Sequence, residues 1–471
     1  MTETVDVAII GAGPAGMAAA RDLKALGLRV LVLDERAGPG GNVHASALDR
    51  PQEAASVLGG DYARGVAEAR GFAASGVPAR YGCSVSRVAG ETIHYLQHGR
   101  LHRITAARLV LATGAIERPV PFPGWELPGI MGAGAFQLML KQSRVVPAGD
   151  YVLCGTGPLV LLMACQLLAL GSRPLAVLDT NSEAAPLGIG LSHLPTLARN
   201  AGAVAKGLSY MARLRLAGIP VISGVTRLEA RGSDAVQAIR YTRRNGSSAS
   251  LDVRMVLFHE GVIPNTQLGL ALDCKHRWDE HERCLIPETD AYGESSRQGT
   301  FIIGDAAGIL GASAAPHSAR LAAMKIAQDL GCRLDDEAGG AVEAARRALN
   351  RERRFRAFLD RAYRPGLAFA APITDETMIC RCEQVTAGAL RQAVRDGARG
   401  PAQAKVFTRC GMGLCQGRIC GNVVTRLIAE ETGLRPRAVG GYHIRFPLKP
   451  MSLIELADEL PMEEPVDEHI A

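Results

Sequence analysis

The segment VDVAIIGAGPAGMAAARDLKALGLRVLVLDE, residues 5–35, restricts the fold more than any other part of the chain. An apolar strand, a GxGxxG turn, a helix and a second apolar strand follow one another in the order of a βαβ unit. The first glycine permits a tight turn, the second lets the backbone approach a pyrophosphate, and the third lets the helix pack closely on the strand. The amino end of the helix offers free N–H groups to the anion, and Asp34 can accept a hydrogen bond from a ribose hydroxyl. The segment therefore predicts a dinucleotide site formed by Gly11, Gly13, Pro14, Ala15, Gly16, Asp34 and Glu35.

Two later segments indicate which dinucleotide binds. LVLATGAIERPVPFPG, Leu109 to Gly124, resembles the strand and ATG turn of flavoproteins with two dinucleotide-binding domains. GTFIIGDAAG, Gly299 to Gly308, resembles their second FAD motif, in which the aspartate bonds the ribityl chain. A bare NAD dehydrogenase has no use for this distal motif, so we predict FAD. The further cofactor-binding residues are Gly41, Asn42, Thr113, Gly114, Gly304 and Asp305. His317 is the candidate catalytic residue, and the competing interpretation is a histidine at a helix start that moves no proton.

A second βαβ pattern begins at Tyr151 and ends at Asp179. Val160 stands where the full motif has its third glycine, and a β-branched side chain there crowds the helix against the strand. No basic residue for an NADPH phosphate follows Asp179. We therefore predict a retained fold with impaired NAD(P) binding; another nucleotide or a partner surface are the alternatives. Residues 151–171 are uncharged and long enough to span a bilayer, but their GTGP turn favours a strand followed by a buried helix.

Five of the eleven cysteines lie after residue 375. MICRCEQVT holds one close pair, and TRCGMGLCQGRICG, Thr408 to Gly421, holds three cysteines at intervals of five. Four thiolates in two close pairs are the usual protein ligands of a [2Fe–2S] cluster, with zinc as the alternative. The CxC spacing resembles bacterioferritin-associated-ferredoxin-like domains, whose pattern points to Cys380, Cys382, Cys415 and Cys420. Cys410 is then a neighbour that packs on the cluster or tunes it. Whether Cys410 replaces one of the four predicted ligands stays open.

The overall composition limits the partners and the location. The 471 residues are 47% hydrophobic and 21% charged, which is ordinary for two to four globular domains. The net charge is +6, and its densest run, residues 346–356, is interpreted as a solvated helix face because no aromatic RNA-binding motif accompanies it. The amino-terminal segment lacks the basic region of a signal peptide, so we expect free thiols and a cytoplasmic protein that binds no nucleic acid. Peripheral docking at the inner membrane face is kept as an alternative.

These features together resemble one family. The FAD motif, the altered second unit, CRCE and TRCGMGLCQGRIC are similar to the larger flavin/iron–sulfur subunits of bacterial heteromeric amino-acid dehydrogenases. This family includes opine oxidases, D-hydroxyproline dehydrogenase, hydrogen cyanide synthase and the archaeal dye-linked proline dehydrogenases. ERPVPFPGWELPGIM (Glu117 to Met131) and HEGVIPNTQL (His259 to Leu268) extend the resemblance over nearly the whole chain.

The resemblance implies a division of labour between subunits. A partner of the D-amino-acid-oxidase type oxidises the amino acid, and the present chain carries the electrons through FAD and [2Fe–2S] to a quinone or dye-type acceptor. An FMN at a subunit interface and a small additional ferredoxin-like subunit are also implied. The rival interpretations are a self-sufficient NAD(P)H-dependent FAD reductase, a hydrogen cyanide synthase subunit or a purely structural subunit.

The predicted fold class is α/β. We expect a flavoprotein with two dinucleotide-binding domains, of the glutathione or thioredoxin reductase type, followed by a small α-helical ferredoxin-like [2Fe–2S] domain. The expected boundaries are an FAD domain split between residues 1–125 and 265–335, a second nucleotide domain at 126–264, a helical linker at 336–374, the cluster domain at 375–435 and a C-terminal tail at 436–471.

Overall fold

The first sheet carries the dinucleotide motif near its middle. In the computed structural model, which describes residues 3–49, 56–181, 200–366 and 372–457, its strand order is β3-β2-β1-β6-β5-β4, with β19 paired to β6. Val7, Ala8 and Ile9 are fully buried because both faces of this parallel region are covered. The strands are β1 (Glu3–Ile10), β2 (Val30–Leu33), β3 (Ala79–Arg80), β4 (Ser84–Ala89), β5 (Thr92–Gln97), β6 (Arg100–Leu111) and β19 (Thr300–Ile302).

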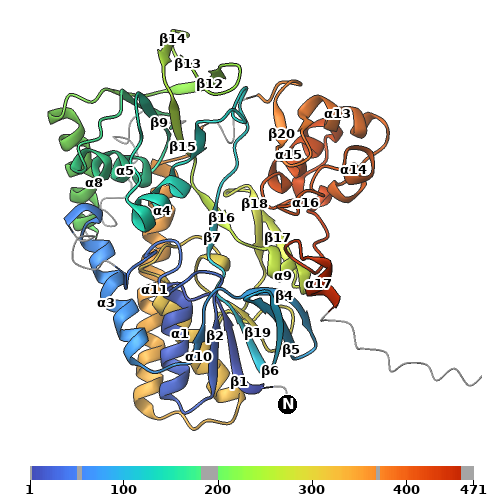
Figure 1. Cartoon of the computed structure of the whole chain (residues 1–471). Helices are drawn as coiled ribbons and strands as arrows, with labels where there is room; N and C mark the ends of the chain where they lie inside the picture. The colour runs from blue at the N-terminus through green and yellow to red at the C-terminus, as the bar shows by residue number, and fades with distance from the viewer. Residues whose placement is uncertain (1–2, 50–55, 182–199, 367–371, 458–471) are drawn as a thin grey trace, which may run out of the picture.

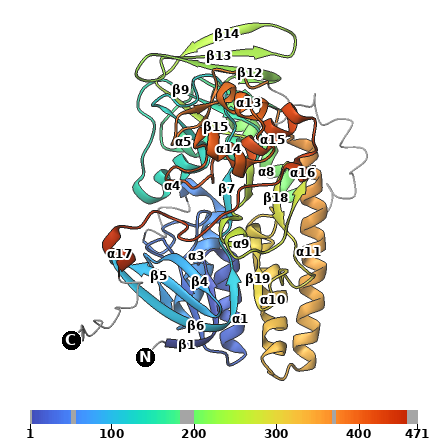
Figure 2. The ribbon, with the colours of Figure 1, turned by 90° about the vertical axis from the view of Figure 1, so that its right-hand side faces the viewer.

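Helices pack beside this sheet and against one another (Figure 2). α1 (Pro14–Ala25) starts directly after the glycine-rich turn and contacts α10 (Ala315–Asp329). α11 (Asp336–Ala362) covers α10 and includes the arginine run, as predicted. Its first turn is capped by the side chain of Asp335, which accepts a hydrogen bond from the backbone N–H of Ala338 at 2.9 Å. α3 (Gly60–Ala74) packs on α1 as well.

A second parallel sheet repeats the nucleotide-binding pattern. Its strand order is β11-β10-β9-β15-β8. The uncharged segment forms a strand, a turn and a helix, as predicted, and among the described residues no helix is long and apolar enough to cross a membrane. The elements are β8 (Ile130–Gly132), α4 (Ala133–Ser143), β9 (Tyr151–Gly155), α5 (Pro158–Ala169), β10 (Ala176–Asp179), α8 (Ala201–Leu216), β11 (Val221–Ile222) and β15 (Met255–His259).

Short strands join the two sheets. β7 (Ala115–Glu117) leads from the first sheet to the second, and β16 (Val262–Pro264) returns antiparallel beside it (Figure 1). α9 (Gln267–Ala271) follows, together with the hairpin of β17 (His276–Asp279) and β18 (Cys284–Pro287). A separate antiparallel sheet of β12 (Val225–Arg231), β13 (Ala238–Arg243) and β14 (Ser248–Asp252) lies at the far end of the second sheet.

The cysteine-rich region forms a small helical domain with its own core. Leu390, Val424 and Leu427 are fully buried in that core. Thr386 caps the helix that follows it, because its hydroxyl accepts a hydrogen bond from the N–H of Ala389 at 3.3 Å. The elements are β20 (Met378–Cys380), β21 (Val385–Thr386), α13 (Ala387–Arg395), α14 (Pro401–Thr408), α15 (Gly421–Thr432) and α16 (Pro436–Val439). A mixed sheet with a parallel nucleotide-binding region, a second sheet that is parallel, and this helical domain confirm the predicted α/β class.

The chain then returns to the first sheet. Residues 440–450, which we call the C-terminal strap, begin in the core of the cysteine domain with Tyr442 and reach the core of the first sheet with Leu448. Lys449 forms an ion pair with Glu35, and α17 (Leu453–Ala457) follows. The described part of the expected tail is therefore packed against two domains; residues 458–471 lie outside the described residues.

Candidate cofactor sites

A cavity of about 690 Å³ lies at the carboxyl ends of the first sheet. Eleven of the thirteen predicted cofactor residues line it, which is where the βαβ rule places a dinucleotide. They are Gly11, Gly13, Pro14, Ala15, Asp34, Glu35, Gly41, Asn42, Thr113, Gly114 and Asp305. Residues that are distant in sequence thus meet in one cavity.

The glycines of the first motif are required by close backbone contacts. Gly11 has φ +108°, and a Cβ there would lie 2.4 Å from the carbonyl oxygen of Ala112. A Cβ on Gly16 would lie 1.8 Å from the carbonyl oxygen of Gly11, so only glycine lets α1 approach β1. A Cβ on Gly304 would come within 2.7 Å of the Ala15 side chain. Gly16 and Gly304 therefore serve the site through packing.

The two acidic residues after β2 differ in their surroundings. Asp34 is 8% exposed, and its carboxylate accepts hydrogen bonds from the backbone N–H groups of Ala12 and Arg36. Burial raises the pKa of Asp34 although both donors oppose the shift. Glu35 is exposed and lines the same cavity. Asp34 therefore fixes the turn through backbone donors, whereas the Glu35 carboxylate is paired with Lys449 at the edge of the cavity.

Asp305 is held at the opposite wall of the cavity. Its carboxylate accepts hydrogen bonds from the backbone N–H groups of Leu310 at 3.0 Å and Gly311 at 2.8 Å. The N–H of Gly304 donates to the Ser318 hydroxyl at 3.1 Å. These bonds orient the turn before α10, whose amino end faces the cavity through Ala315.

Several lining residues have no counterpart in the motifs. Lys141 of α4 donates to the carbonyl oxygens of Asn42 and Val43 at 3.2 and 2.8 Å. Burial lowers the pKa of Lys141 to about 7. Leu159 and Gln166 of α5 line the cavity from the second domain. These positions are distant in sequence and carry no pattern of their own, so they become visible only in the folded chain.

The boundary between the two sheets contains a buried carboxylate–imidazole pair. Nδ1 of His259 lies 2.7 Å from Oε1 of Glu117, which also accepts a hydrogen bond from the N–H of Gly134 at 3.0 Å. Arg118 donates to the carbonyl oxygens of Glu260 and Glu282. The ERPVP and HEGVIP segments are thus the joint between the domains.

His317 lies elsewhere. It is partly buried on α10 and lines a separate cavity of about 520 Å³ with Met17, Arg21 and Arg320. Burial lowers its pKa. The structure therefore places the candidate catalytic histidine between α1, α10 and α11, in a cavity that borders the dinucleotide cavity at Pro14.

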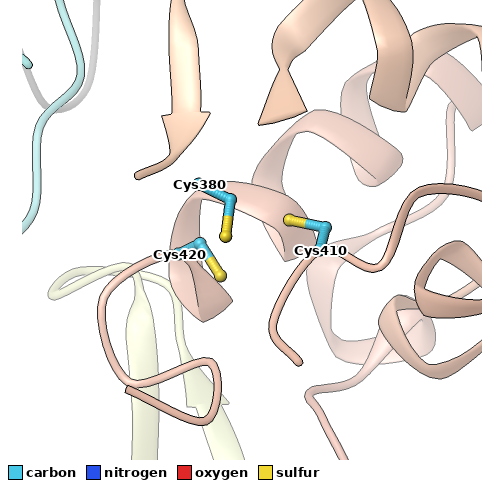
Figure 3. A group of neighbouring side chains, drawn as sticks. All are labelled: Cys380, Cys410 and Cys420. Atoms are coloured by element: carbon cyan, nitrogen blue, oxygen red, sulfur yellow. The ribbon is translucent and has the colours of Figure 1, made fainter. Parts of the chain in front are cut away.

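Three cysteines of the helical domain point toward one another (Figure 3). Cys380 ends β20, Cys410 follows α14, and Cys420 precedes α15; their sulfur atoms lie within 4.8 Å of one another. All three are buried. Hydrogen bonds with Cys410 and Cys420 lower the pKa of the Cys380 thiol well below its usual range, toward the thiolate form that metals require.

The other two cysteines lie beside this group. Cys382 is exposed, Cys415 is partly buried, and their side chains contact each other. A cavity of about 360 Å³ is lined by Cys380, Cys382, Cys415 and Cys420, which are the four predicted ligands. Four thiols around one cavity fit a [2Fe–2S] cluster, whereas the three converging sulfurs include Cys410. The assignment of the four ligands stays a prediction.

The comparisons with known proteins agree with this architecture. Residues 5–329 match the family described as pyridine nucleotide-disulphide oxidoreductase, and residues 378–430 match the BFD-like [2Fe-2S] binding domain. The A subunit of opine oxidase from Rhizobium meliloti is 40% identical over 97% of this chain and 88% of that protein. The chain belongs to the pyridine nucleotide-disulphide oxidoreductase family.

Further relatives extend the match. The A subunit of opine oxidase from Agrobacterium tumefaciens is 39% identical over 97% of this chain and 92% of its own length. Hydrogen cyanide synthase subunit HcnB of Pseudomonas aeruginosa is 34% identical over 94% and 96%. L-proline dehydrogenase from P. horikoshii shares the fold, with a TM-score of 0.67 at 21% identity over 97% of this chain and 80% of that chain. The chain is thus an FAD-dependent oxidoreductase subunit with a [2Fe–2S] domain, as predicted.

Proposed function

We propose that the chain is the electron-transfer subunit of a heteromeric amino-acid dehydrogenase of the opine or D-hydroxyproline type. A partner of the D-amino-acid-oxidase type oxidises the amino acid, and the chain passes the two electrons to a quinone or dye-type acceptor. The naming of relatives as the A subunit of an opine oxidase supports a partner and this substrate class. The family implies FAD for two-electron exchange and [2Fe–2S] for single-electron exchange, so together they convert one into the other.

One observation carries this proposal: the two cofactor sites adjoin within one chain. Arg418 lies between Cys415 and Cys420 and also lines the FAD cavity. On another side, the indole N–H of Trp125 donates to the carbonyl oxygen of Met378 at 2.6 Å, which ties the domain joint to the strand that ends in Cys380. Such packing holds the sites at a fixed separation, as electron transfer requires.

The second nucleotide unit argues against an NAD(P)H reductase. Glu260 is fully buried at the carboxyl end of β15, where dinucleotide phosphates bind in this type of sheet. Its carboxylate accepts a hydrogen bond from the hydroxyl of Thr180, which follows β10. A buried carboxylate at this edge disfavours a phosphate. Glu260 and Val160 therefore both support impaired NAD(P) binding in the second unit.

A hydrogen cyanide synthase subunit is the second candidate. The match to HcnB covers nearly all of both chains, so the fold and cofactors leave both functions open to this chain. Its substrate, as an expectation from the family, is glycine. The two candidates differ in the partner and in the product released.

The test is anaerobic spectroscopy of the co-expressed complex. The chain is purified with the product of a neighbouring D-amino-acid-oxidase-like gene, and flavin, iron and zinc are quantified. Octopine, nopaline, D-hydroxyproline, proline and glycine are added in turn, and flavin bleaching and the EPR spectrum are recorded. A reduced [2Fe–2S] signal with an opine or D-hydroxyproline supports the proposal. A signal with glycine and release of cyanide supports the second candidate.

The same preparation tests the remaining partners. Flavin released by acid is separated into FAD and FMN, which decides whether an interface FMN is present. Reoxidation by a soluble quinone is compared with reoxidation by a dye. Reduction by NADPH alone, or zinc in place of iron, would contradict the dehydrogenase assignment.

A further inference from the structure

The FAD cavity takes part of its lining from the far end of the sequence. Arg418, on the loop between Cys415 and Cys420, lines it together with Asn265 and Gln267. Lys449 of the C-terminal strap lines it as well. Neither residue belongs to a dinucleotide-binding motif. The cluster domain is therefore part of the wall of the flavin site.

Two polar atoms in this part of the wall have no partner. Nε of Arg418 is shielded from solvent and makes no hydrogen bond within the described structure. The same holds for Oε1 of Gln267, a residue that is only 9% exposed. A buried donor or acceptor that stays unpaired is costly. Both residues line the FAD cavity and a smaller cavity of about 40 Å³, so a polar group of a ligand bound there can satisfy these atoms.

The charges in the cavity favour a cation at this position. The first domain contributes several carboxylates to the described lining, among them Asp34, Glu35 and Asp305. FAD brings a pyrophosphate with two further negative charges. Arg418 adds a guanidinium, whose planar fork of donors suits phosphate oxygens. Its charge already acts on this region: burial raises the pKa of Glu35, but Lys449 and Arg418 bring it below its usual value.

The position of Arg418 depends on the cluster domain. The two flanking cysteines are predicted cluster ligands, so the loop is fixed at both ends when the cluster is bound. Gly417 has φ +76°, and a Cβ there would come within 2.6 Å of the Tyr442 ring. The Tyr442 hydroxyl donates to the carbonyl oxygen of Cys410 at 2.9 Å. The loop is thereby clamped between the cysteines and the strap.

We propose that Arg418 binds FAD from the cluster-ligand loop, so that a loaded cluster domain strengthens FAD binding. The coupling is reciprocal, because two ligands that favour the same ordered loop raise each other's affinity by the same factor. FAD binding then also slows the loss of iron. This role adds a cofactor-binding residue to the known type of site and holds for either candidate function.

The first experiment replaces the guanidinium in the full-length protein. FAD is removed under conditions that keep the iron, and its rebinding is followed by flavin fluorescence. Arg418→Met keeps the aliphatic stem and should weaken FAD binding at least about tenfold, as expected for one charge-assisted contact. Arg418→Lys keeps the charge and should weaken it less. Arg445→Met, at an exposed position of the strap, is the matched control and should bind FAD as the wild type does.

The second experiment removes the cluster from the wild type. An iron chelator under reducing, anaerobic conditions should weaken FAD binding by a similar factor, and the same treatment of Arg418→Met should have little further effect. FAD affinity that is independent of iron in the wild type would overturn the coupling. An iron-loaded Arg418→Met protein that binds FAD as tightly as the wild type would overturn the contact between Arg418 and FAD. So would FAD binding that depends on the iron content alone and is the same with and without the arginine. Neither substrate nor partner is needed, so failure here is distinct from failure of the proposed dehydrogenase function.

Discussion

The two βαβ units of this chain share a turn and differ in the residues around it. Gly11 has φ +108°, and a Cβ there would lie 2.4 Å from the carbonyl oxygen of Ala112. Gly155 has φ +133°, and a Cβ there would lie 1.7 Å from the carbonyl oxygen of His259. In both units the first glycine packs directly against the backbone at the end of the neighbouring strand. That glycine is therefore required by the fold and says little about the ligand.

The next positions separate the units. Ala112 and His259 occupy equivalent positions in the two units. The residues that follow them, Thr113 and Glu260, are therefore equivalent as well. Thr113 is neutral, lines the FAD cavity and donates to the carbonyl oxygen of Asn265 at 3.1 Å. Glu260 is a fully buried acid. The comparison teaches that a GxG turn predicts the sheet, and we expect the residue after the central strand to decide whether a phosphate is accepted there.

The largest expected effect comes from exchanging the residues at the third glycine position of the GxGxxG motif, which are Gly16 in the first unit and Val160 in the second. Gly16→Val would place a Cβ 1.8 Å from the carbonyl oxygen of Gly11, so α1 cannot approach β1. We expect a protein that is insoluble or purifies without FAD. Flavin and iron content per chain are the measurements. A soluble Gly16→Val protein with a full complement of FAD would contradict the packing argument.

Val160→Gly is the matched variant in the second unit. Val160 is 2% exposed and packs in the same core as Leu153 and Val177. Its removal should lower the free energy of unfolding by about 2–4 kcal/mol through lost packing and a helical glycine. FAD content should stay at the wild-type level. The exchange would then show that the same motif position permits close helix packing beside the FAD site in one unit and fills a core in the other.

The next largest effect concerns the cluster domain, which borders the first unit. Cys415→Ala removes a predicted ligand and should abolish the [2Fe–2S] signal, with FAD binding weakened through the Arg418 loop. Cys410→Ala should keep the iron, because the 360 Å³ cavity is lined by the other four cysteines. Iron analysis and EPR of both variants decide the ligand set. Loss of iron in Cys410→Ala with retention in Cys415→Ala would reverse the assignment.

The first motif was predictable because its geometry is local. Turn, helix and strand follow one another, so Gly11, Gly13 and Asp34 are placed by neighbouring backbone. The cysteines were predictable as a group only. Cys410, Cys415 and Cys420 have equal spacings, and the direction of each thiol depends on how α14 and α15 pack.

Residues brought by tertiary contacts were not predictable. Lys141, Arg418 and Lys449 reach the FAD cavity from a helix, a cluster loop and a strap. Arg418 lies inside the cluster motif, which does not mark it for the flavin site, and the sequence neighbours of Lys141 and Lys449 carry no cofactor pattern. His317 shows the converse: although it follows the second FAD motif closely in sequence, it lines a neighbouring cavity with residues of α1 and α11, and its role as a catalytic residue stays a prediction.

A smaller effect is expected from exchanging the residues after the central strands. Thr113→Glu gives the first unit the acid of the second, and its charge should oppose the pyrophosphate and weaken FAD binding by roughly ten- to a hundredfold. Thr113→Gln has a similar size without the charge and is the control. Fluorescence titration with FAD measures both. Equal affinities of the two variants would show that size, not charge, separates the units.

The smallest effect is a pH dependence that His44 gives to the first unit. His44 lines the FAD cavity and is 4% exposed, its Nδ1 has no hydrogen-bond partner, and burial lowers its pKa from 6.5 to about 4. Between these values the unfolded chain binds a proton that the folded chain does not, so stability falls as the pH drops from 6.5 toward 4. Linkage gives a loss of roughly 2 kcal/mol between pH 7.5 and pH 5.

His44→Gln tests this dependence, because it removes the titrating group and should reduce the loss of unfolding free energy over that range. Urea unfolding at pH 7.5 and pH 5 is the measurement, with His98→Asn, in the exposed turn between β5 and β6, as the control. If His44→Gln and His98→Asn lose stability equally with acid, the imidazole of His44 is accessible to protons in the folded protein. In that case the wall of the FAD cavity opens to solvent beside His44, and the burial of this imidazole would not set the pH dependence of the first unit.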